Sequence, residues 1–230
     1  MRREALIIGS PDAGIPGVRV DMRNWESFLA SGTGGAWNGA EVRKLENPTT
    51  FALKSMLSTV ISKSDYAFIT FSGHGYVDES GRTVLQINDR ETILATELIA
   101  TASRQTIVID CCRVPVRSSA VLKESARIYA ADSASNRQLL RQKFDRAVAD
   151  CDPGLIRLYS CSVGETAGES PSDGGIYTHS LIRAAEPVSR VKSVRQAHDE
   201  AKILTTKQNP GQTPTSQYPR STTSFPFSVS

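Results

Sequence analysis

Two short apolar segments of this chain each end at residues that can do chemistry. Residues 66–71, with the sequence YAFITF, lead into Ser-Gly-His-Gly around His74. Residues 106–110, TIVID, lead into the adjacent thiols Cys111 and Cys112. Both segments are short, rich in β-branched and aromatic residues, and bounded by glycine or polar residues. They are therefore predicted to be buried strands of a parallel sheet.

The ends of these two strands define the expected site. Open α/β sheets place their sites beyond the carboxyl ends of the strands. Here one strand end carries an imidazole between two glycines, and the other carries a thiol just after a carboxylate. A cysteine brought next to a histidine is the minimum equipment for nucleophilic acyl transfer.

Strand patterns alternate with helical patterns through the first half of the chain, which predicts an α/β fold with a parallel sheet and right-handed crossovers. No repeat and no linker is found, so residues 1–230 are interpreted as one domain. The expected strands cover 5–8, 42–45, 66–71, 84–87, 92–94, 106–110, 154–160 and 225–229. The expected helices cover 20–29, 50–62, 95–102, 118–150 and 191–204, a glycine loop enters a helix within 174–182, and 209–220 is expected to be a loop.

Composition excludes several classes of function. The net charge is only +3, and no basic stripe with interleaved aromatic residues is present, so no nucleic-acid partner is expected. The four cysteines form no C-x-x-C pair, which argues against zinc and against a thioredoxin-like motif. The sequence has no run of about 18 apolar residues, so no membrane span is expected. The first apolar run is too short for a signal peptide. We expect a cytoplasmic protein with reduced thiols.

The order of these motifs resembles the caspase-like cysteine proteases, and within them the metacaspase and bacterial caspase-like branch. The resemblance rests on Ser-Gly-His-Gly and Asp-Cys-Cys-Arg, each at a strand end, with His74 and Cys112 38 residues apart. It also extends to residues 5–9, to residues 158–178 and to the ending around Gln212 and Phe225. It implies a three-layer caspase-like sandwich, a protein or peptide substrate, and no cofactor.

Two adjacent cysteines leave the nucleophile open on periodicity alone. Successive strand side chains point to opposite faces, so Cys111 shares a face with Ile107 and Ile109, and Cys112 with Asp110. A buried parallel strand is apolar on both faces, so this alternation does not decide between them. The family resemblance does, because its nucleophile lies two residues after the aspartate, at Cys112. Cys111 fits a small buried core residue.

The resemblance also assigns the remaining chemistry. A free thiol is only a few per cent thiolate at pH 7, so Cys112 needs a base, and His74 would supply it. The N–H groups of Gly75 and Cys112 would form the oxyanion hole. Val114 replaces the glycine that usually follows the nucleophile motif, so the loop there is expected to differ from that of the caspases proper.

Specificity is expected to differ from that of the caspases proper as well. Asp110 stands where they have a glutamine that helps to accept aspartate. By resemblance to metacaspases, Asp110 and Asp21 would form an acidic pocket that attracts a P1 arginine or lysine and repels aspartate. The alternative for Asp21 is an acid at a helix N-terminus, stabilised by the helix dipole.

Other candidate residues carry weaker signals. Many metacaspases bind calcium, but the acids between the two motifs, at 78, 79, 89 and 91, lack an EF-hand spacing and favour a solvated hairpin edge. Calcium therefore stays a minor alternative, and no metal ligand is assigned. His179 and His198 are expected to be surface or cap residues. Three acids of the glycine-rich loop are candidates for substrate binding: Glu165, Glu169 and Asp173.

The interpretation we favour is a cysteine endopeptidase with a Cys-His dyad and a basic P1 preference. By family resemblance it would cut itself in the basic segment 113–150, respond to an activating partner protein, and act in bacterial stress or anti-phage defence. One alternative is a catalytically silent caspase-like regulatory or scaffold protein, although such relatives usually lose the histidine or the cysteine. A thiol-redox enzyme using Cys111 and Cys112 is disfavoured, because a disulfide between adjacent cysteines closes a strained ring.

Overall fold

The computed structural model describes residues 1–115, 134–186, 190–220 and 224–230. A six-stranded sheet runs through its centre, in the order β12-β8-β7-β3-β1-β2. Five strands are parallel, and only β12 is antiparallel to its neighbour β8. Its strands are β1 (Arg3–Ser10), β2 (Val42–Glu46), β3 (Tyr66–Gly73), β7 (Arg104–Asp110), β8 (Gly154–Tyr159) and β12 (Thr215–Gln217).

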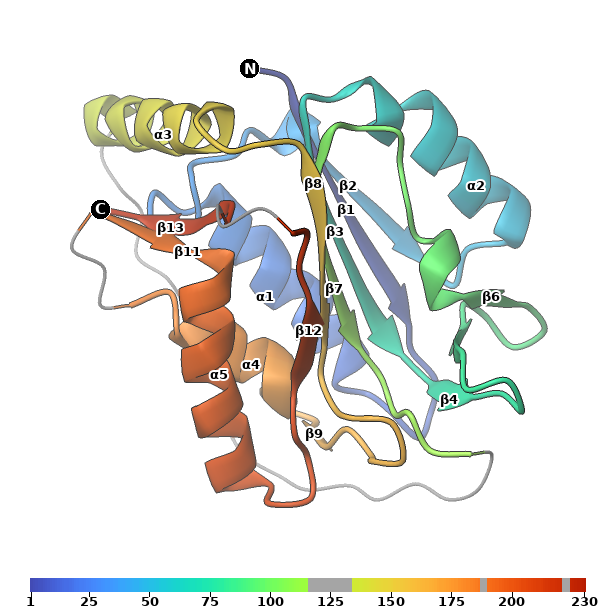
Figure 1. Ribbon diagram of the computed structural model, residues 1–230. Coiled ribbons are helices and arrows are strands. Elements are labelled where there is room, and N and C mark those ends of the chain that lie inside the picture. The colour runs from blue at the N-terminus through green and yellow to red at the C-terminus, as the bar shows by residue number, and fades with distance from the viewer. Residues whose placement is uncertain (116–133, 187–189, 221–223) are drawn as a thin grey trace.

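Helices cover both faces of this sheet, as the α/β prediction requires (Figure 1). Helix α2 (Thr50–Thr59) covers one face. The other face is covered by α1 (Val18–Ala30), α3 (Ala134–Ala149), α4 (Ile176–Arg183) and α5 (Val194–Gln208). Short 3₁₀ turns occur at Gly39–Glu41, Ile61–Lys63 and Ala95–Glu97.

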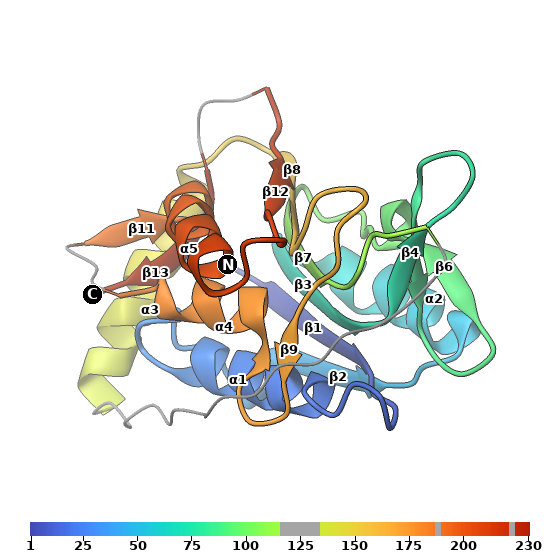
Figure 2. The same cartoon turned by 90° about the horizontal axis from the view of Figure 1, so that it is seen from below.

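Three small sheets complete the fold. The first, β4 (Gly75–Val77), β5 (Thr83–Gln86) and β6 (Thr92–Leu94), contains the expected hairpin. The second pairs β9 (Glu169–Ser170) with β10 (Gly174–Gly175), and the third pairs β11 (Val191–Ser193) with β13 (Pro226–Val229). Figure 2 views the main sheet from the carboxyl ends of its parallel strands, where β4 and β9 lie.

The alternation of side chains along each strand divides the core into two layers. On β7, Val108 faces the layer with α1, α3, α4 and α5, whereas Ile107 and Ile109 face the layer with α2. The first layer is rich in aromatic contacts: the Phe28 and Phe227 rings stack with centroids 4.9 Å apart. Because every central strand is buried on both faces, its position in the sheet is determined by packing on two sides.

Most of the expected elements are confirmed, and four expectations are wrong. The helix expected at 95–102 is only a 3₁₀ turn at Ala95–Glu97, and the Gln105 side chain binds both the N–H and the carbonyl of Ala100 in the non-helical backbone that follows. Residues 191–193 form β11 rather than the start of α5. In the expected helix 118–150, residues 116–133 lie outside the described residues. The helical spacing also predicts an apolar side shared by Leu139, Leu140, Phe144 and Val148, but Leu139 is exposed on α3.

The fourth difference concerns the C-terminal loop, which forms the edge strand β12. Residues 215–217 pair with β8 despite their polar sequence. The buried Gln212 explains how this tail is held, because its amide donates to the Ser160 carbonyl (3.0 Å) and accepts from the Gly168 N–H (2.9 Å). A polar side chain therefore ties the tail to the carboxyl edge of the sheet.

Candidate active site

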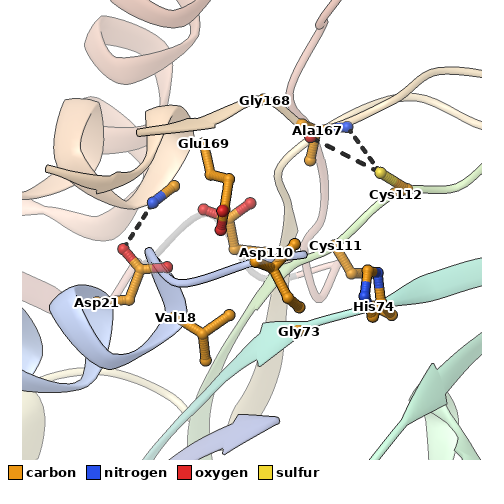
Figure 3. A pocket seen from close by; sticks show the side chains of 12 residues that line it. Val18, Asp21, Gly73, His74, Asp110, Cys111, Cys112, Ala167, Gly168 and Glu169 are labelled. Atoms are coloured by element: carbon orange, nitrogen blue, oxygen red, sulfur yellow. Dashed lines mark hydrogen bonds between the residues drawn. The ribbon is translucent and has the colours of Figure 1, made fainter. Parts of the chain in front are cut away.

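The predicted strand ends lie side by side. Strands β3 and β7 pair in parallel with Ser72 opposite Asp110, so the residues that follow each strand leave the sheet at neighbouring points. A pocket at this edge contains about 340 Å³ of empty space, part of it open to solvent. Its lining brings together the expected residues His74, Cys112, Asp21 and Asp110 (Figure 3). Other lining residues come from the loop after β1, from α1 and from the β9–β10 region: Ile15, Val18, Ala167, Gly168, Glu169 and Gly175.

The two cysteines differ in environment. The Cys111 side chain is 3% exposed and belongs to the same core layer as Ile107 and Ile109, the face that strand periodicity assigns to it. Burial raises the pKa of its thiol well above the ordinary value. Cys112 is only partly buried and lines the pocket. Cys112 is therefore the thiol that a substrate can reach.

The Cys112 sulfur is held by the backbone of Ala167. It accepts from the Ala167 N–H at 3.4 Å and lies 3.7 Å from the Ala167 carbonyl oxygen, to which the thiol donates. Burial raises the pKa of this thiol, the Ala167 N–H lowers it, and the charges of Asp110 and Glu169 raise it again. The net shift is upward, so the resting group is a thiol that needs a base before it can attack.

His74 has a partner that the sequence did not identify. Its Nε2 lies 2.8 Å from Oδ2 of Asp12, a residue of the loop between β1 and α1. The other carboxylate oxygen of Asp12 accepts from the N–H groups of Gly14 (2.7 Å) and Ile15 (3.1 Å). In the sequence, Pro-Asp-Ala-Gly is an ordinary turn pattern, and nothing in it indicates contact with a histidine 62 residues later.

Gly75 begins β4 beside Cys111 and Cys112. The Gln86 N–H binds the His74 carbonyl, so in this antiparallel pair the Gly75 N–H points away from β5. The Val77 N–H, two residues on, points the same way and binds the Val114 carbonyl. A Cβ at Gly75 would lie 2.5 Å from Cys111 Sγ and 2.9 Å from the Cys112 carbonyl oxygen. Only glycine fits this approach, and its N–H is directed to the side of the segment that follows β7.

The two aspartates are buried and bind one short segment. Asp21 accepts the Gly175 N–H at 2.8 Å, and Asp110 accepts the N–H and the hydroxyl of Thr178 at 3.0 and 2.7 Å. Burial and the neighbouring Asp110 charge raise the pKa of Asp21. Burial also raises the pKa of Asp110, although the hydrogen bonds that Asp110 accepts lower it in part. None of the described residues that line the pocket is a lysine or an arginine. The pair therefore lacks a cationic partner within the pocket lining.

The loop acids separate into one pocket residue and two others. Glu169 lines the pocket, and burial raises its pKa to about 7. The hydrogen bond from the Gly17 N–H lowers this pKa, whereas the charges of Asp110 and Asp12 raise it further. Glu165 instead accepts from the N–H groups of Ser162 and Thr213. Asp173 is buried with an oxygen 3.8 Å from His179 Nδ1. Of the three acids, Glu169 is thus the one that lines the pocket.

One histidine expectation is wrong. His198 is 2% exposed, and its Nδ1 lies 2.7 Å from the Tyr177 hydroxyl. Burial lowers the pKa of His198 to about 4, with the Lys202 charge adding to the effect. His198 lies on the same face of α5 as Val194, Ala197 and Ala201, so helical spacing could have indicated its burial. His198 is a core residue rather than a surface or cap residue.

The acids between the two motifs engage protein groups. Asp78 pairs with Arg82, and Glu91 accepts from Asn88 and the Thr50 N–H. Across the described ranges, no group of three or more His, Cys, Asp or Glu side chains is arranged to hold a metal ion. None of the helices in these ranges combines the length and the apolar character that a bilayer span requires.

Comparison with known proteins adds the family. A family model described as a caspase domain matches residues 2–226. Among solved structures, caspase-1 from Spodoptera frugiperda matches with a TM-score of 0.61 and 13% identity, over 94% of this chain and 86% of that chain. At this identity the structural likeness concerns the fold. No curated protein matches the sequence.

Proposed function

Because the chain belongs to the caspase-domain family of cysteine peptidases, we propose that it is an endopeptidase that uses Cys112 and His74 and cleaves after arginine or lysine. The observation that supports this most is the pocket itself. It combines a partly exposed thiol, an imidazole and two buried carboxylates, and no described lining residue is cationic. The metacaspase-like branch, rather than the caspases proper, fits this acidic lining.

The proposed reaction follows from the residue chemistry. His74 takes the proton of Cys112, and the sulfur attacks the scissile carbonyl carbon. The Gly75 and Cys112 N–H groups stabilise the oxyanion, and one such donor is commonly worth about 3 kcal/mol. His74 then gives its proton to the leaving amine, and the C–N bond breaks to leave a thioester. Water, deprotonated by His74, releases the acid and restores the thiol.

The substrate side chain would bind through charge. Asp21 and Asp110 line the pocket beside Cys112, so an extended substrate with its carbonyl at the sulfur can place a cationic P1 side chain between them. A P1 aspartate would add a further negative charge to a desolvated acidic pocket, which like-charge repulsion opposes. This pocket supports the pair as the specificity element, in preference to a helix-start role for Asp21 alone.

The test is a P1 profile of the purified protein. Fluorogenic peptides that differ only in P1 (Arg, Lys, Asp or Leu) should be hydrolysed when P1 is basic, and iodoacetamide should abolish the hydrolysis. The Cys112→Ala variant is the control for contaminating proteases. A preference for aspartate or leucine would refute the proposed role of the acidic pocket but would not affect the assignment of Cys112 as the nucleophile. No hydrolysis under any condition, with a well-folded protein, would favour the silent scaffold.

Other parts of the proposal rest on the family resemblance alone. They are an activating partner protein, self-processing, and a part in bacterial stress or anti-phage defence. A cytoplasmic location is supported by the four cysteines, all of which are free thiols. Calcium stays a minor alternative, tested by repeating the peptide assay with a chelator.

A further inference from the structure

The carboxylate of Asp12 is fixed at both oxygens. Oδ1 accepts the Gly14 and Ile15 N–H groups at 2.7 and 3.1 Å, which closes a turn in the loop before α1. Oδ2 lies 2.8 Å from His74 Nε2. The loop amides therefore orient the carboxylate before any substrate arrives, and the carboxylate in turn holds the imidazole ring.

We propose that Asp12 is a positioning residue of the catalytic group: it orients the His74 ring and sets its tautomer. The inference rests on the proposed roles of His74 and Cys112. It makes the apparatus a Cys-His-Asp arrangement whose third member comes from the loop after the first strand, rather than the Cys-His dyad expected from the sequence.

The tautomer follows from the chemistry of the contact. Partial burial raises the pKa of Asp12, but the Gly14 N–H and the charge and hydrogen bond of His74 outweigh it, so the net shift is downward. Asp12 is therefore ionised at neutral pH and can only accept a hydrogen bond. Nε2 must carry the ring proton, which leaves Nδ1 as the one basic nitrogen of the neutral ring. Nδ1 is then the atom that receives the Cys112 proton.

Among the acids near His74, Asp12 is the one that contacts the imidazole ring. The other titratable groups that line the pocket are two thiols directly after β7, Cys111 and Cys112, and three acids on β7, α1 and β9, Asp110, Asp21 and Glu169. None of these three acids hydrogen-bonds to His74, whereas Asp12 does. When His74 takes the thiol proton, the imidazolium keeps a carboxylate at Nε2 and donates to the leaving group from Nδ1. A fixed ring loses little orientational freedom during the reaction.

Three variants separate the roles of the loop and of the histidine contact. Asp12→Asn keeps an oxygen for the Gly14 and Ile15 N–H groups, but it turns an NH₂ group toward Nε2. Asp12→Ala removes both functions, and Asp12→Glu retains the charge on a longer side chain. Asp89→Asn is the matched control, since Asp89 is exposed in the β5–β6 turn and pairs with its neighbour Arg90.

We expect Asp12→Asn to lower kcat by about 100-fold, the lower end of the range for losing an effective general base, with KM nearly unchanged. Asp12→Glu should restore part of this activity, and Asp89→Asn should match the wild type. The thermal midpoint of Asp12→Asn should stay near that of the wild type, because the loop turn survives. A kcat within about threefold of the wild type for Asp12→Asn would overturn the proposal.

A second readout does not depend on peptidase activity. The chain has only three histidines, so ¹⁵N spectra of the Cys112→Ala protein can be assigned to His74 with a His74→Gln variant. The neutral ring should be the Nε2–H tautomer with Asp12 in place, and should shift toward the Nδ1–H tautomer in Asp12→Asn. An unchanged tautomer would overturn the role of Asp12. If the wild type hydrolyses no peptide, the proposed function fails, and this spectrum still tests Asp12.

Discussion

Asp21 of α1 and Asp110 at the end of β7 hold the same segment from two sides. Asp21 accepts the Gly175 N–H at 2.8 Å, and Asp110 accepts the N–H and the hydroxyl of Thr178 at 3.0 and 2.7 Å. Gly174 adopts φ +85°, and a Cβ at Gly174 or Gly175 would overlap these carboxylates. The glycine pair therefore lets the backbone approach two buried acids, and the acids in turn define one wall of the pocket.

This relationship leads to a prediction for the acid pair. Asp110→Asn should lower kcat/KM for an Arg-ended peptide by on the order of 100-fold or more, because removing one partner of a desolvated ion pair costs about 3–5 kcal/mol. Asp21→Asn should have a smaller effect in the same direction. P1 profiles of the wild type and both variants provide the measurement, with Asp89→Asn as the control for net charge. Equal activity of Asp21→Asn and the wild type would reduce Asp21 to a structural acid.

The identity of the nucleophile gives a second prediction. Cys112→Ala should abolish peptide hydrolysis, whereas Cys111→Ala should keep most of it and lose about 1 kcal/mol of stability as a buried side chain is trimmed. His74→Ala should match Cys112→Ala, and the double variant should be little worse, because residues that act as a unit are non-additive. Steady-state kinetics and denaturant melts measure both effects. The reverse order of the two cysteine variants would assign catalysis to Cys111.

Glu169 is expected to make substrate affinity depend on pH. Burial raises its pKa to about 7, so it gains its negative charge near neutrality. Affinity of the Cys112→Ala protein for an Arg-ended peptide should rise by roughly fivefold between pH 6 and 8, the upper range for a partly solvated ion pair. Fluorescence anisotropy measures this without catalysis, and Glu169→Gln should reduce the rise. An identical pH dependence in both proteins would remove Glu169 from the substrate side.

The same shift has a consequence for stability. The folded protein holds a proton on Glu169 that the unfolded chain releases from about pH 4.5 upward, the ordinary value of this group. The Glu169 contribution to the free energy of unfolding is therefore fully present below pH 4.5 and is lost as pH rises through about 7. Urea melts at pH 5 and pH 8 should show a larger fall for the wild type than for Glu169→Gln.

Self-processing, if it occurs, should avoid helix α3. Peptidases bind extended backbone, and α3 buries Leu140, Phe144 and Val148 against the core, so cleavage after its basic residues would require the helix to unfold. The Arg113 side chain is held by Thr83, Cys161 and Thr215. The remaining sites, after Arg117, Lys123 and Arg127, lie outside the described residues.

Intact mass measurement of the active protein tests this directly. Fragments ending at one of these three residues should form in the wild type, and the Cys112→Ala protein should stay intact. Cuts within α3 would contradict the structural argument. An intact chain that hydrolyses peptides would show that activity needs no cut.

Local sequence determined the central sheet and the position of its chemistry. The runs 66–71 and 106–110 are short, branched and apolar, so they form strands in many contexts, and polar residues at their ends mark where a parallel sheet opens to a site. The period of two along β7 also indicated that Cys111 shares the face of Ile107 and Ile109, and the structure places it there. Such features depend only on neighbours along the chain.

Tertiary structure decided the features that residues adjacent in sequence do not determine. Ala100 is not helical, and the Gln105 side chain binds its N–H and carbonyl. Strand β12 forms because Gln212 ties the tail to Ser160 and Gly168, and His198 is buried because it contacts Tyr177 of α4. Asp12 reaches His74 across 62 residues in the same way. Each depends on a side chain meeting a group that is distant in sequence. Local pattern constrains which face a side chain occupies, whereas the folded arrangement of strands and loops determines what it meets there.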